Sequence, residues 1–267
     1  TSASANVLSR CRYLICDMDG VLWQGNEPLP GLGHLFEFLH EHRIGFILAT
    51  NNSSRTPEQY VAKLAGFGIE VQPEHILTSS QVAAAYLATI APAGTPVYAI
   101  GEDGLRQALT ERGFSLAERD ARYVVVGWDR QLTWEKLATA TLLIDRGAGF
   151  IGTNPDYNYP TERGPAPGNG AQLAALETAT RVRPVVVAFD AAPGVLARLR
   201  AIDGAQDIDL LWAAPTAQGD GAAWQSDWRI SRLATSALLG PSAATGKRPV
   251  LGVDLYVEDL AGALGIR

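Results

Sequence analysis

A short apolar segment that ends in two aspartates constrains the fold more than any other feature of the chain. Residues 13–16 read Tyr-Leu-Ile-Cys, and Asp17 and Asp19 follow with one methionine between them. Short apolar runs bounded by a glycine-containing turn are typical of a buried β-strand. Because side chains alternate between the two faces of a strand, we predict that the two carboxylates lie on one side and Met18 on the other.

Two carboxylates at the end of a strand can support chemistry. Open α/β sheets bind ligands in the crevice beyond the carboxyl ends of their strands. A carboxylate placed there can bind a hard divalent cation, and one of the pair can attack an electrophile. Taken alone, the same residues also fit an acidic surface turn, so the interpretation depends on the rest of the chain.

The composition indicates a globular protein with a small ligand. The chain has 267 residues, enough for one large domain or two smaller ones, and 47% of them are hydrophobic and 19% charged. A formal charge of -6 without a basic run argues against a nucleic-acid or anionic-membrane partner.

The cysteines and the N-terminal residues predict a cytoplasmic location. Cys11 and Cys16 lie close together in the chain, which suits free thiols in a reducing compartment better than a disulfide framework. Residues 1–10 lack the apolar core of a signal peptide, and no stretch is long and apolar enough for a membrane span.

A second polar cluster follows the next predicted strand, at residues 44–49. It reads Thr50-Asn51-Asn52-Ser53-Ser54, and it precedes a helix with Thr56 as N-cap and Gln59 closing a capping box. Short hydroxyl and amide groups at a strand end suit an oxyanion such as phosphate, to which Thr50 and Asn51 can donate hydrogen bonds. Ordinary turn chemistry remains the alternative for this cluster on its own.

Strands and helices alternate through the rest of the first two thirds of the chain. We predict strands at 76–79, 97–100, 123–127 and 150–153, and helices at 81–89, 103–112 and 133–146. A break rich in Pro and Gly at 91–96 marks a domain junction, after which the pattern describes a second, smaller α/β unit. Residues 154–170 are predicted to form a long substrate-facing loop, followed by a helix that bears Leu173 and Leu176.

These motifs together resemble the haloacid dehalogenase-like phosphatases. Within them, the chain is similar to the branch that contains 4-nitrophenyl phosphatases, phosphoglycolate phosphatases and nucleotide phosphatases. Three signatures carry the resemblance: residues 17–23, residues 50–53 and the stretch 152–177. The resemblance implies an α/β fold, with a Rossmann-like core of parallel sheet at residues 1–81 and 183–267. It also implies a smaller α/β cap domain inserted at residues 82–182.

The resemblance also implies a mechanism. Asp17 would take the phosphoryl group, and Asp19 would protonate the leaving oxygen and then activate water. Thr50 and Asn51 would bind the phosphoryl oxygens, while Asp17 and the backbone carbonyl of Asp19 would bind Mg²⁺. The cap would choose the leaving group, with Asn154, Asp156 and Tyr157 at the mouth of the site.

Two further family motifs are not recognisable. After residues 185–187 the family continues with Gly-Lys-Pro, whose lysine binds the phosphoryl group, but this chain reads Ala188-Phe189-Asp190. Asp220 is the nearest equivalent of the later metal-binding aspartate, and Asp207, Asp209 and Asp227 are rivals. Unless an arginine such as Arg198 supplies the cation, we expect activity 10²–10³-fold below that of family members, as an order of magnitude.

The sequence therefore predicts a Mg²⁺-dependent phosphomonoester hydrolase of small phosphorylated metabolites, with a homodimer as an open possibility. A catalytically impaired phospholigand-binding protein on the same fold is the alternative. The loss of family pattern is confined to residues 188–232, which indicates either decay of function or a sequence error such as a pair of compensating frameshifts. We predict that the backbone there keeps the family's path, with a helix at 193–199 and a strand near residues 210–213, before a closing helix at 257–260.

Overall fold

The computed structural model describes residues 13–19, 21–161 and 164–186, and the backbone of three strands further along. The chain divides into two compact units. Unit 1 comprises Thr1–Ala49, Lys63–Ile76 and Ala192–Arg267; unit 2 comprises Thr50–Ala62 and Leu77–Ala191. The predicted domain limits at residues 82 and 182 rest on the family resemblance and stay a prediction.

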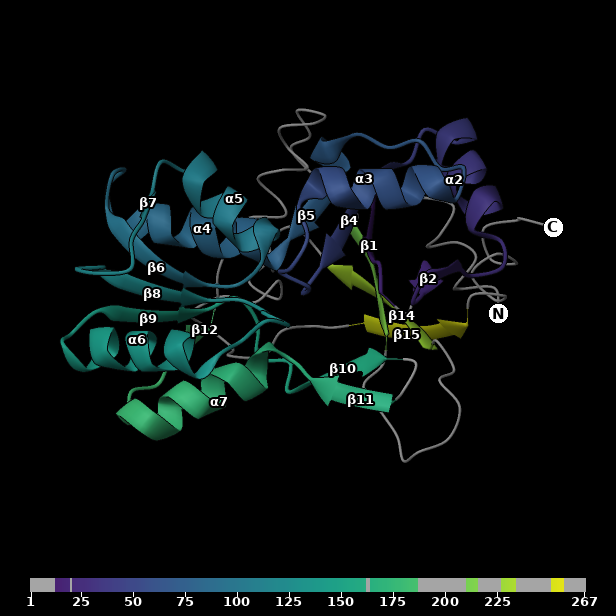
Figure 1. Ribbon diagram of the computed structural model, residues 1–267. Coiled ribbons are helices and arrows are strands. Elements are labelled where there is room, and N and C mark those ends of the chain that lie inside the picture. Colours follow the sequence, from purple (N-terminus) through teal and green to yellow (C-terminus); the bar gives the residue numbers. More distant parts are fainter. Residues whose placement is uncertain are drawn as a thin grey trace, which may run out of the picture. The chain divides into compact units, whose positions relative to one another are not determined.

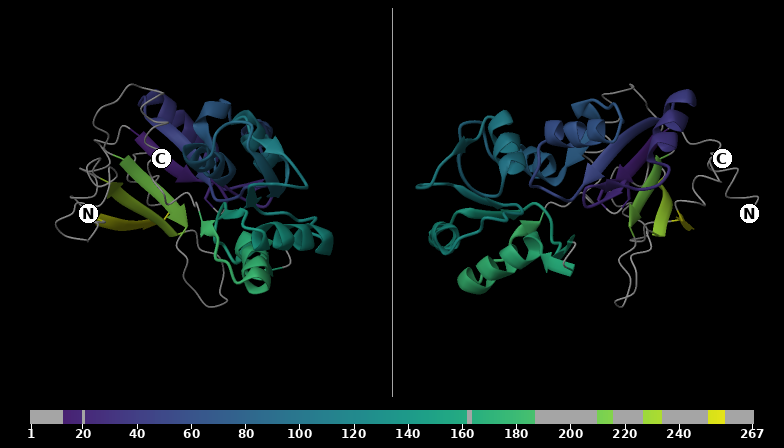
Figure 2. Two further views of the ribbon diagram at one scale, coloured as in Figure 1. Left: turned by 90° about the vertical axis from the view of Figure 1, so that its left-hand side faces the viewer. Right: turned by 45° about the vertical axis from the view of Figure 1, so that its right-hand side comes forward.

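Most strands of unit 1 belong to a six-stranded sheet. Its order is β15-β14-β13-β1-β4-β5. The strands are β1 (Tyr13–Asp17), β4 (Gly45–Thr50), β5 (Ile76–Thr78), β13 (Leu210–Pro215), β14 (Asp227–Leu233) and β15 (Leu251–Tyr256). Strand β1 pairs in parallel with β4 and β13, whereas β13, β14 and β15 pair antiparallel. Figure 2 shows these last three strands side by side in green and yellow.

Two α-helices and two short strands lie between β1 and β5 of this sheet along the chain. Helix α2 (Leu32–Glu41) buries Leu32 and Leu39, which are seven residues apart and therefore lie on one helical face. Strands β2 (Trp23–Gln24) and β3 (Glu27–Pro28) form a small antiparallel pair. Helix α3 (Pro57–Gly66) follows β4 along the chain.

Unit 2 contains a five-stranded parallel sheet between two layers of helices. The order is β12-β9-β8-β6-β7, and the strands are β6 (Pro96–Ile100), β7 (Ser115–Leu116), β8 (Tyr123–Val126), β9 (Gly149–Gly152) and β12 (Val185–Val186). Helices α4 (Ser79–Ile90) and α5 (Asp103–Glu111) cover one face, and α6 (Trp134–Asp145) and α7 (Asn169–Thr180) cover the other (Figure 1).

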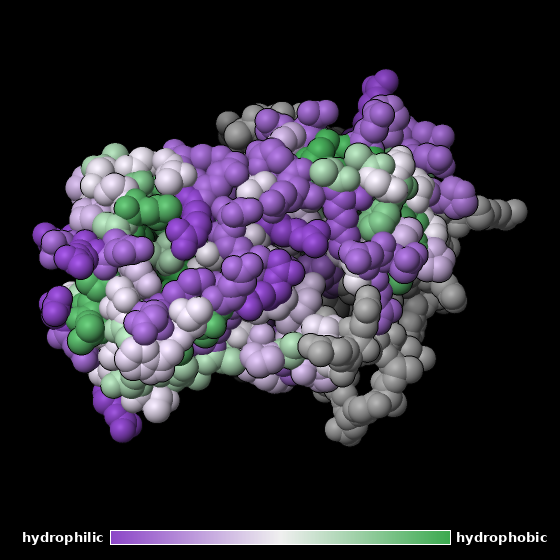
Figure 3. All heavy atoms as spheres, in the orientation of Figure 1, coloured by the Kyte–Doolittle hydropathy of each residue, from purple (hydrophilic) through white to green (hydrophobic). Residues whose placement is uncertain are grey.

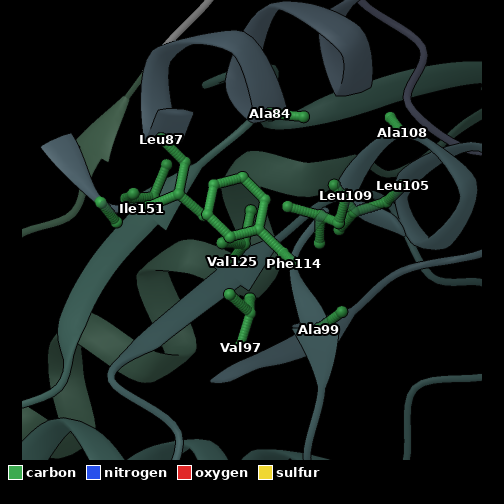
Figure 4. Close-up of a cluster of buried hydrophobic side chains, with 11 residues drawn as sticks. Ala84, Leu87, Val97, Ala99, Leu105, Ala108, Leu109, Phe114, Val125 and Ile151 are labelled. Atoms are coloured by element: carbon green, nitrogen blue, oxygen red, sulfur yellow. The ribbon is translucent and has the colours of Figure 1, made fainter. Parts of the chain in front are cut away.

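Two hydrophobic clusters hold these layers together. On one face, Leu87 of α4 and Leu109 of α5 pack with Val97 and Val125 of the sheet (Figure 4). On the other face the strand neighbours of those valines, such as Val124, pack against α6 and α7. Because both faces are buried, the strands read as continuous apolar runs, which explains why they stand out in the sequence.

Most of the predicted elements are confirmed, and one prediction is wrong. Residues 154–170 are not a loop throughout, because β10 (Asn158–Thr161) and β11 (Gly164–Pro167) pair as an antiparallel hairpin. Their prolines hid this pairing, since proline is disfavoured in most strands but tolerated in edge positions. The strand predicted near residue 210 is confirmed as β13, whereas β14 and β15 were not predicted. The helices predicted at 193–199 and 257–260 lie outside the described residues.

The face drawn in Figure 3 is largely hydrophilic, and its hydrophobic residues lie in separate small patches. Among the described residues, no helix combines the length and the apolar character that crossing a membrane would need.

Candidate active site

The two aspartates lie at the carboxyl end of β1. Asp17 is the last residue of the strand and stands in register with Ala49 of β4. Met18 is fully buried, whereas Asp17 and Asp19 are each partly exposed. The carboxylates therefore leave the sheet at the edge where α/β sheets bind ligands.

Residues close in sequence orient both carboxylates. The backbone N–H of Met18 donates to Asp17 Oδ1 at 2.8 Å. The indole N–H of Trp23 donates to Asp19 Oδ1, also at 2.8 Å. The chain turns tightly after Met18, because the N–H of Leu22 donates to the carbonyl of Met18 at 2.8 Å. We call residues 17–23 the aspartate turn.

The neighbouring cysteine is not a competing nucleophile. Cys16 is fully buried, and its thiol donates to the backbone carbonyl of Asp17 at 3.1 Å. Burial, and after it the charge of Asp17, raises the pKa of the Cys16 thiol well above its ordinary value. The thiol stays protonated at neutral pH, and a protonated thiol is a poor nucleophile.

Residues 50–55, which we call the Thr50 loop, begin where β4 ends. Thr50 is buried, and its hydroxyl oxygen accepts from the N–H of Asn52 at 3.0 Å. The amide oxygen of Asn52 in turn accepts from the N–H and the hydroxyl of Ser54 at 3.0 and 2.8 Å. Side chains thus satisfy the backbone of a short polar turn, as Asx and Thr turns commonly do.

Residues far along the chain fix this loop within unit 2. The hydroxyl of Ser79 and the amide of Asn154 both donate to the carbonyl of Asn51, at 2.6 and 2.7 Å. The hydroxyl of Ser80 donates to the carbonyl of Ser53 at 2.8 Å, and the Ser53 hydroxyl accepts from the N–H of Trp128 at 2.7 Å. The loop is therefore held rigidly by at least four hydrogen bonds from outside it.

The structure places the three predicted cap residues in different environments. Asn154 is buried and bonds Asn51, so one predicted cap residue contacts one predicted phosphate-binding residue. Asp156 is exposed, and its N–H donates to the Asn154 side chain at 3.2 Å. The side chain of Tyr157 is 77% exposed.

The Gly168-Asn169-Gly170 segment has a structural role beside these residues. A Cβ at Gly170 would lie 2.2 Å from the carbonyl oxygen of Pro155, and one at Gly168 would lie 2.3 Å from that of Asp156. The N–H of Gly170 donates to the same Asp156 carbonyl at 2.7 Å. The glycines therefore permit the close backbone approach that fixes the residues after Asn154.

Two of the metal ligands that the family resemblance implies lie among the described residues. Asp17 and the carbonyl of Asp19 are hard oxygen donors of the kind that divalent cations such as Mg²⁺ prefer. In the part of the chain that the structure describes, no cluster of three or more His, Cys, Asp or Glu side chains could hold a metal. Asp220, the predicted third ligand, and its rivals Asp207 and Asp209 lie outside the described residues. For Asp227 only the backbone is described, at the start of β14.

The two lysines that the structure describes are already engaged. Lys63 donates to the carbonyl of Gly25 at 2.8 Å, and Lys136 donates to Asp129 Oδ2 at 2.6 Å.

The structure also reveals supporting residues that the sequence did not suggest, above all Ser79 and Ser80. Their signal is weak in sequence, because serines at the start of a helix serve equally well as ordinary helix-terminal residues.

Comparisons with known proteins bear on these residues. A family model described as haloacid dehalogenase-like hydrolase matches residues 14–115. An acid sugar phosphatase from Staphylococcus saprophyticus is 42% identical over 176 residues, which cover 66% of this chain and 67% of that protein. The matched region thus spans about two thirds of this relative's length.

Two solved structures that resemble this chain are also phosphatases. A 4-nitrophenylphosphatase from Thermotoga maritima superposes with a TM-score of 0.69 and 31% identity, covering 75% of this chain and 76% of that one. A glycerol phosphate phosphatase from Mycobacterium tuberculosis, crystallised in complex with magnesium, superposes with a TM-score of 0.69 and 31% identity. That match covers 76% of this chain and 62% of the other.

Proposed function

Because the chain belongs to the haloacid dehalogenase-like hydrolases, we propose that it is a Mg²⁺-dependent phosphatase that forms an aspartyl-phosphate on Asp17. The observation that carries the proposal is the pair of carboxylates at the end of β1, next to the strand that ends in Thr50. A carboxylate that attacks phosphorus needs a second carboxyl group nearby to manage the proton, and the one-residue spacing supplies it.

Each residue has a distinct part in this proposal. Asp17 attacks the phosphorus atom, and Asp19 protonates the leaving oxygen and later removes a proton from the attacking water. The hydroxyl of Thr50 and the amide of Asn51 donate hydrogen bonds to the phosphoryl oxygens. Asp17, the Asp19 carbonyl and Asp220 would hold Mg²⁺, which would neutralise the charge that builds up on those oxygens.

The names of the relatives support a sugar or polyol phosphate as substrate. One relative is named acid sugar phosphatase, and a structural neighbour is named glycerol phosphate phosphatase. Small hydroxylated substrates suit a polar cap segment such as the one that carries Asn154, Asp156 and Tyr157. We place these three residues on the leaving-group side, with Asn154 acting through the Thr50 loop that it bonds.

Hydrolysis of 4-nitrophenyl phosphate and glycerol phosphate, with and without Mg²⁺, tests the proposal. Asp17→Asn should lower kcat by a factor on the order of 10³–10⁶, because an amide cannot accept the phosphoryl group. Asp145→Asn removes the same charge from an exposed position at the end of α6 and should leave kcat unchanged. Turnover by Asp17→Asn at the rate of the Asp145→Asn control would refute the role of Asp17.

A phospholigand-binding protein without turnover is the second candidate. It is favoured because the described lysines are engaged elsewhere, whereas the family uses a lysine at the phosphoryl group. Such a protein would bind inorganic phosphate or vanadate tightly and hydrolyse neither ester. Calorimetry with vanadate, run beside the two hydrolysis assays, separates binding with turnover from binding alone.

The residues between 188 and 232 decide between the two candidates. An intact mass that disagrees with the printed sequence would indicate a sequence error and restore the expectation of full activity. A mass that agrees, together with activity 10²–10³-fold below that of a family phosphatase, as an order of magnitude, would indicate decay of function. An agreeing mass with full turnover would contradict the decay account.

A further inference from the structure

One turn of unit 2 places a buried carboxylate directly beside a support of the Thr50 loop. Residues 127–131, which we call the β8 turn, follow strand β8, and Asp129 at their centre is 3% exposed. The backbone N–H of Trp128 donates to Ser53 Oγ in the loop at 2.7 Å. A Cβ at Gly127 would lie only 2.7 Å from the same oxygen, so the turn and the loop are in close contact. A shift of the β8 turn would therefore move the N–H group on which the Thr50 loop rests.

Asp129 closes the β8 turn with both of its carboxylate oxygens. Oδ1 accepts from the backbone N–H of Gln131 at 2.8 Å, and Oδ2 accepts from Nζ of Lys136 at 2.6 Å. The same Nζ donates to the Gln131 carbonyl at 3.0 Å. Hydrogen bonds between charged groups are stronger than those between neutral ones, and burial of the carboxylate keeps water from competing. These bonds fix the backbone of the turn on both sides of Asp129.

Two helices on one face of the unit 2 sheet hold Asp129 from outside the turn. Lys136 belongs to the first turn of α6, where its N–H donates to the capping hydroxyl of Thr133 at 3.3 Å. Gln172 of α7 donates its side-chain N–H to the Asp129 carbonyl at 3.0 Å. The Oε1 atom of Gln172 is buried and accepts no hydrogen bond from the residues that the structure describes. A buried amide that satisfies only its donor costs stability, so Gln172 fits a positioning role better than a purely stabilising one.

We propose that the ion pair of Asp129 and Lys136 positions the Thr50 loop for phosphate binding. The inference rests on the proposed phosphatase function, in which this loop binds the phosphoryl oxygens. The ion pair fixes the β8 turn, and the turn holds Ser53 through the N–H of Trp128. Asp129 and Lys136 are therefore positioning residues, which act through the loop rather than on the substrate.

This role predicts the same loss for every phosphoester, because the phosphoryl group is common to all of them. Asp129→Ala removes both carboxylate hydrogen bonds. We expect it to lower kcat/KM for glycerol phosphate and for 4-nitrophenyl phosphate by one common factor, on the order of tenfold. The Kd for vanadate, which resembles the phosphoryl group and carries no leaving group, should rise by a similar factor.

A loss confined to one ester would overturn the inference. It would show that the β8 turn acts on the leaving group instead. The route for such an effect exists, because the indole N–H of Trp128 donates to the carbonyl of Pro167, at the end of β11, at 3.1 Å. The comparison of two esters therefore separates an effect on the Thr50 loop from an effect on the hairpin.

Two further variants separate the ion pair from a general loss of stability. Lys136→Met removes the charge from a side chain that is 30% exposed, and it should reproduce the changes of Asp129→Ala. It carries the test alone if Asp129→Ala does not fold. Arg183→Met breaks an exposed ion pair with Glu177 in the same unit and should leave kcat/KM and the vanadate Kd unchanged. Thermal unfolding shows whether each variant is folded. Equal losses in Lys136→Met and Arg183→Met would overturn the inference.

Amide hydrogen exchange tests the coupling without turnover. In Lys136→Met we expect faster exchange both in residues 127–131 and in the Thr50 loop, and in Arg183→Met in neither segment. Faster exchange confined to residues 127–131 would show that the Thr50 loop keeps its place without the ion pair. That result would overturn the inference whether or not the protein is active.

The two proposals fail in different ways. An active wild-type enzyme whose Thr50 loop exchanges at an unchanged rate in Lys136→Met would overturn the positioning role and leave the phosphatase function intact. A wild-type protein that hydrolyses neither ester with Mg²⁺ would overturn the phosphatase function and with it the catalytic meaning of the ion pair.

Discussion

The aspartate turn and the Thr50 loop are held in opposite ways. Asp17 and Asp19 receive their hydrogen bonds from residues one and four positions away. The Thr50 loop receives its bonds from residues 27, 28, 75 and 103 positions distant from their partners in the loop, alongside local bonds of its own. The first arrangement is largely contained in a short motif, and the second forms only when unit 2 has folded. Variants that remove distant support should therefore damage the Thr50 loop and leave the aspartate turn intact.

Among the variants that test this contrast, Gly104→Ala, at the start of α5, is expected to have the largest effect. An added Cβ would lie 2.3 Å from the carbonyl oxygen of Arg55 and 2.7 Å from that of Ser53, so the Thr50 loop would have to move. We expect the free energy of unfolding to fall by about 1–3 kcal/mol and the KM for phosphoesters to rise. Urea unfolding and steady-state kinetics measure the two effects.

Gly33→Ala is the matched control for Gly104→Ala. Gly33 also lies near the start of a helix, but nothing lies within 4 Å of its added Cβ. Alanine there should raise the free energy of unfolding by about 0.5–1 kcal/mol through helix propensity. Equal effects of both substitutions would show that the Thr50 loop does not depend on its close contact with α5.

Asn154→Ala should have the next largest effect. It removes one of the two hydrogen bonds to the Asn51 carbonyl and leaves the bond from Ser79 in place. The lost bond is expected to cost about 1–2 kcal/mol of stability, with a rise in KM of up to about tenfold. Asn158→Ala, at an exposed position of β10, should change neither quantity. A KM of Asn154→Ala that matches the Asn158→Ala value would argue against coupling between the cap segment and the loop.

Thr56→Ala tests local support after the same loop. The Thr56 hydroxyl accepts from the N–H of Gln59, and the Gln59 side chain accepts from the N–H of Thr56, which closes a capping box. We expect a loss of about 1 kcal/mol. Thr133→Ala removes an equivalent cap from α6 and should cost a similar amount. Only Thr56→Ala should also impair phosphoester hydrolysis, because only that helix follows the Thr50 loop directly.

The same contrast explains what could be predicted from the sequence. The aspartate turn, the capping box of α3 and the strands of unit 2 depend on short-range patterns, so the motif, the capping residues and the alternation of strands and helices were predicted. The support from Ser79, Ser80 and Asn154 depends on the tertiary fold, and no local pattern marks it. The hairpin β10–β11 was missed because prolines weaken its strand signal, and β14 and β15 because no family pattern guides their region.

The smallest effect is expected from a charge near the Thr50 loop. Burial alone raises the pKa of Glu102, but hydrogen bonds from Arg130, its charge and that of Arg55 outweigh burial, so the pKa lies below its ordinary value. A lowered carboxyl pKa stabilises the fold above the unfolded value of about 4.3, and this stability is lost as the pH falls through the folded pKa.

Glu102→Gln should therefore lower stability at neutral pH and have no effect at a pH below the folded pKa. The loss should stay well under about 1 kcal/mol, because Arg130 is more than half exposed and water screens the pair. Urea unfolding across this pH range measures it, with Glu135→Gln on α6 as a control that removes the same charge. A loss in Glu102→Gln that persists below the folded pKa would show that Glu102 supports the Thr50 loop by packing rather than by charge.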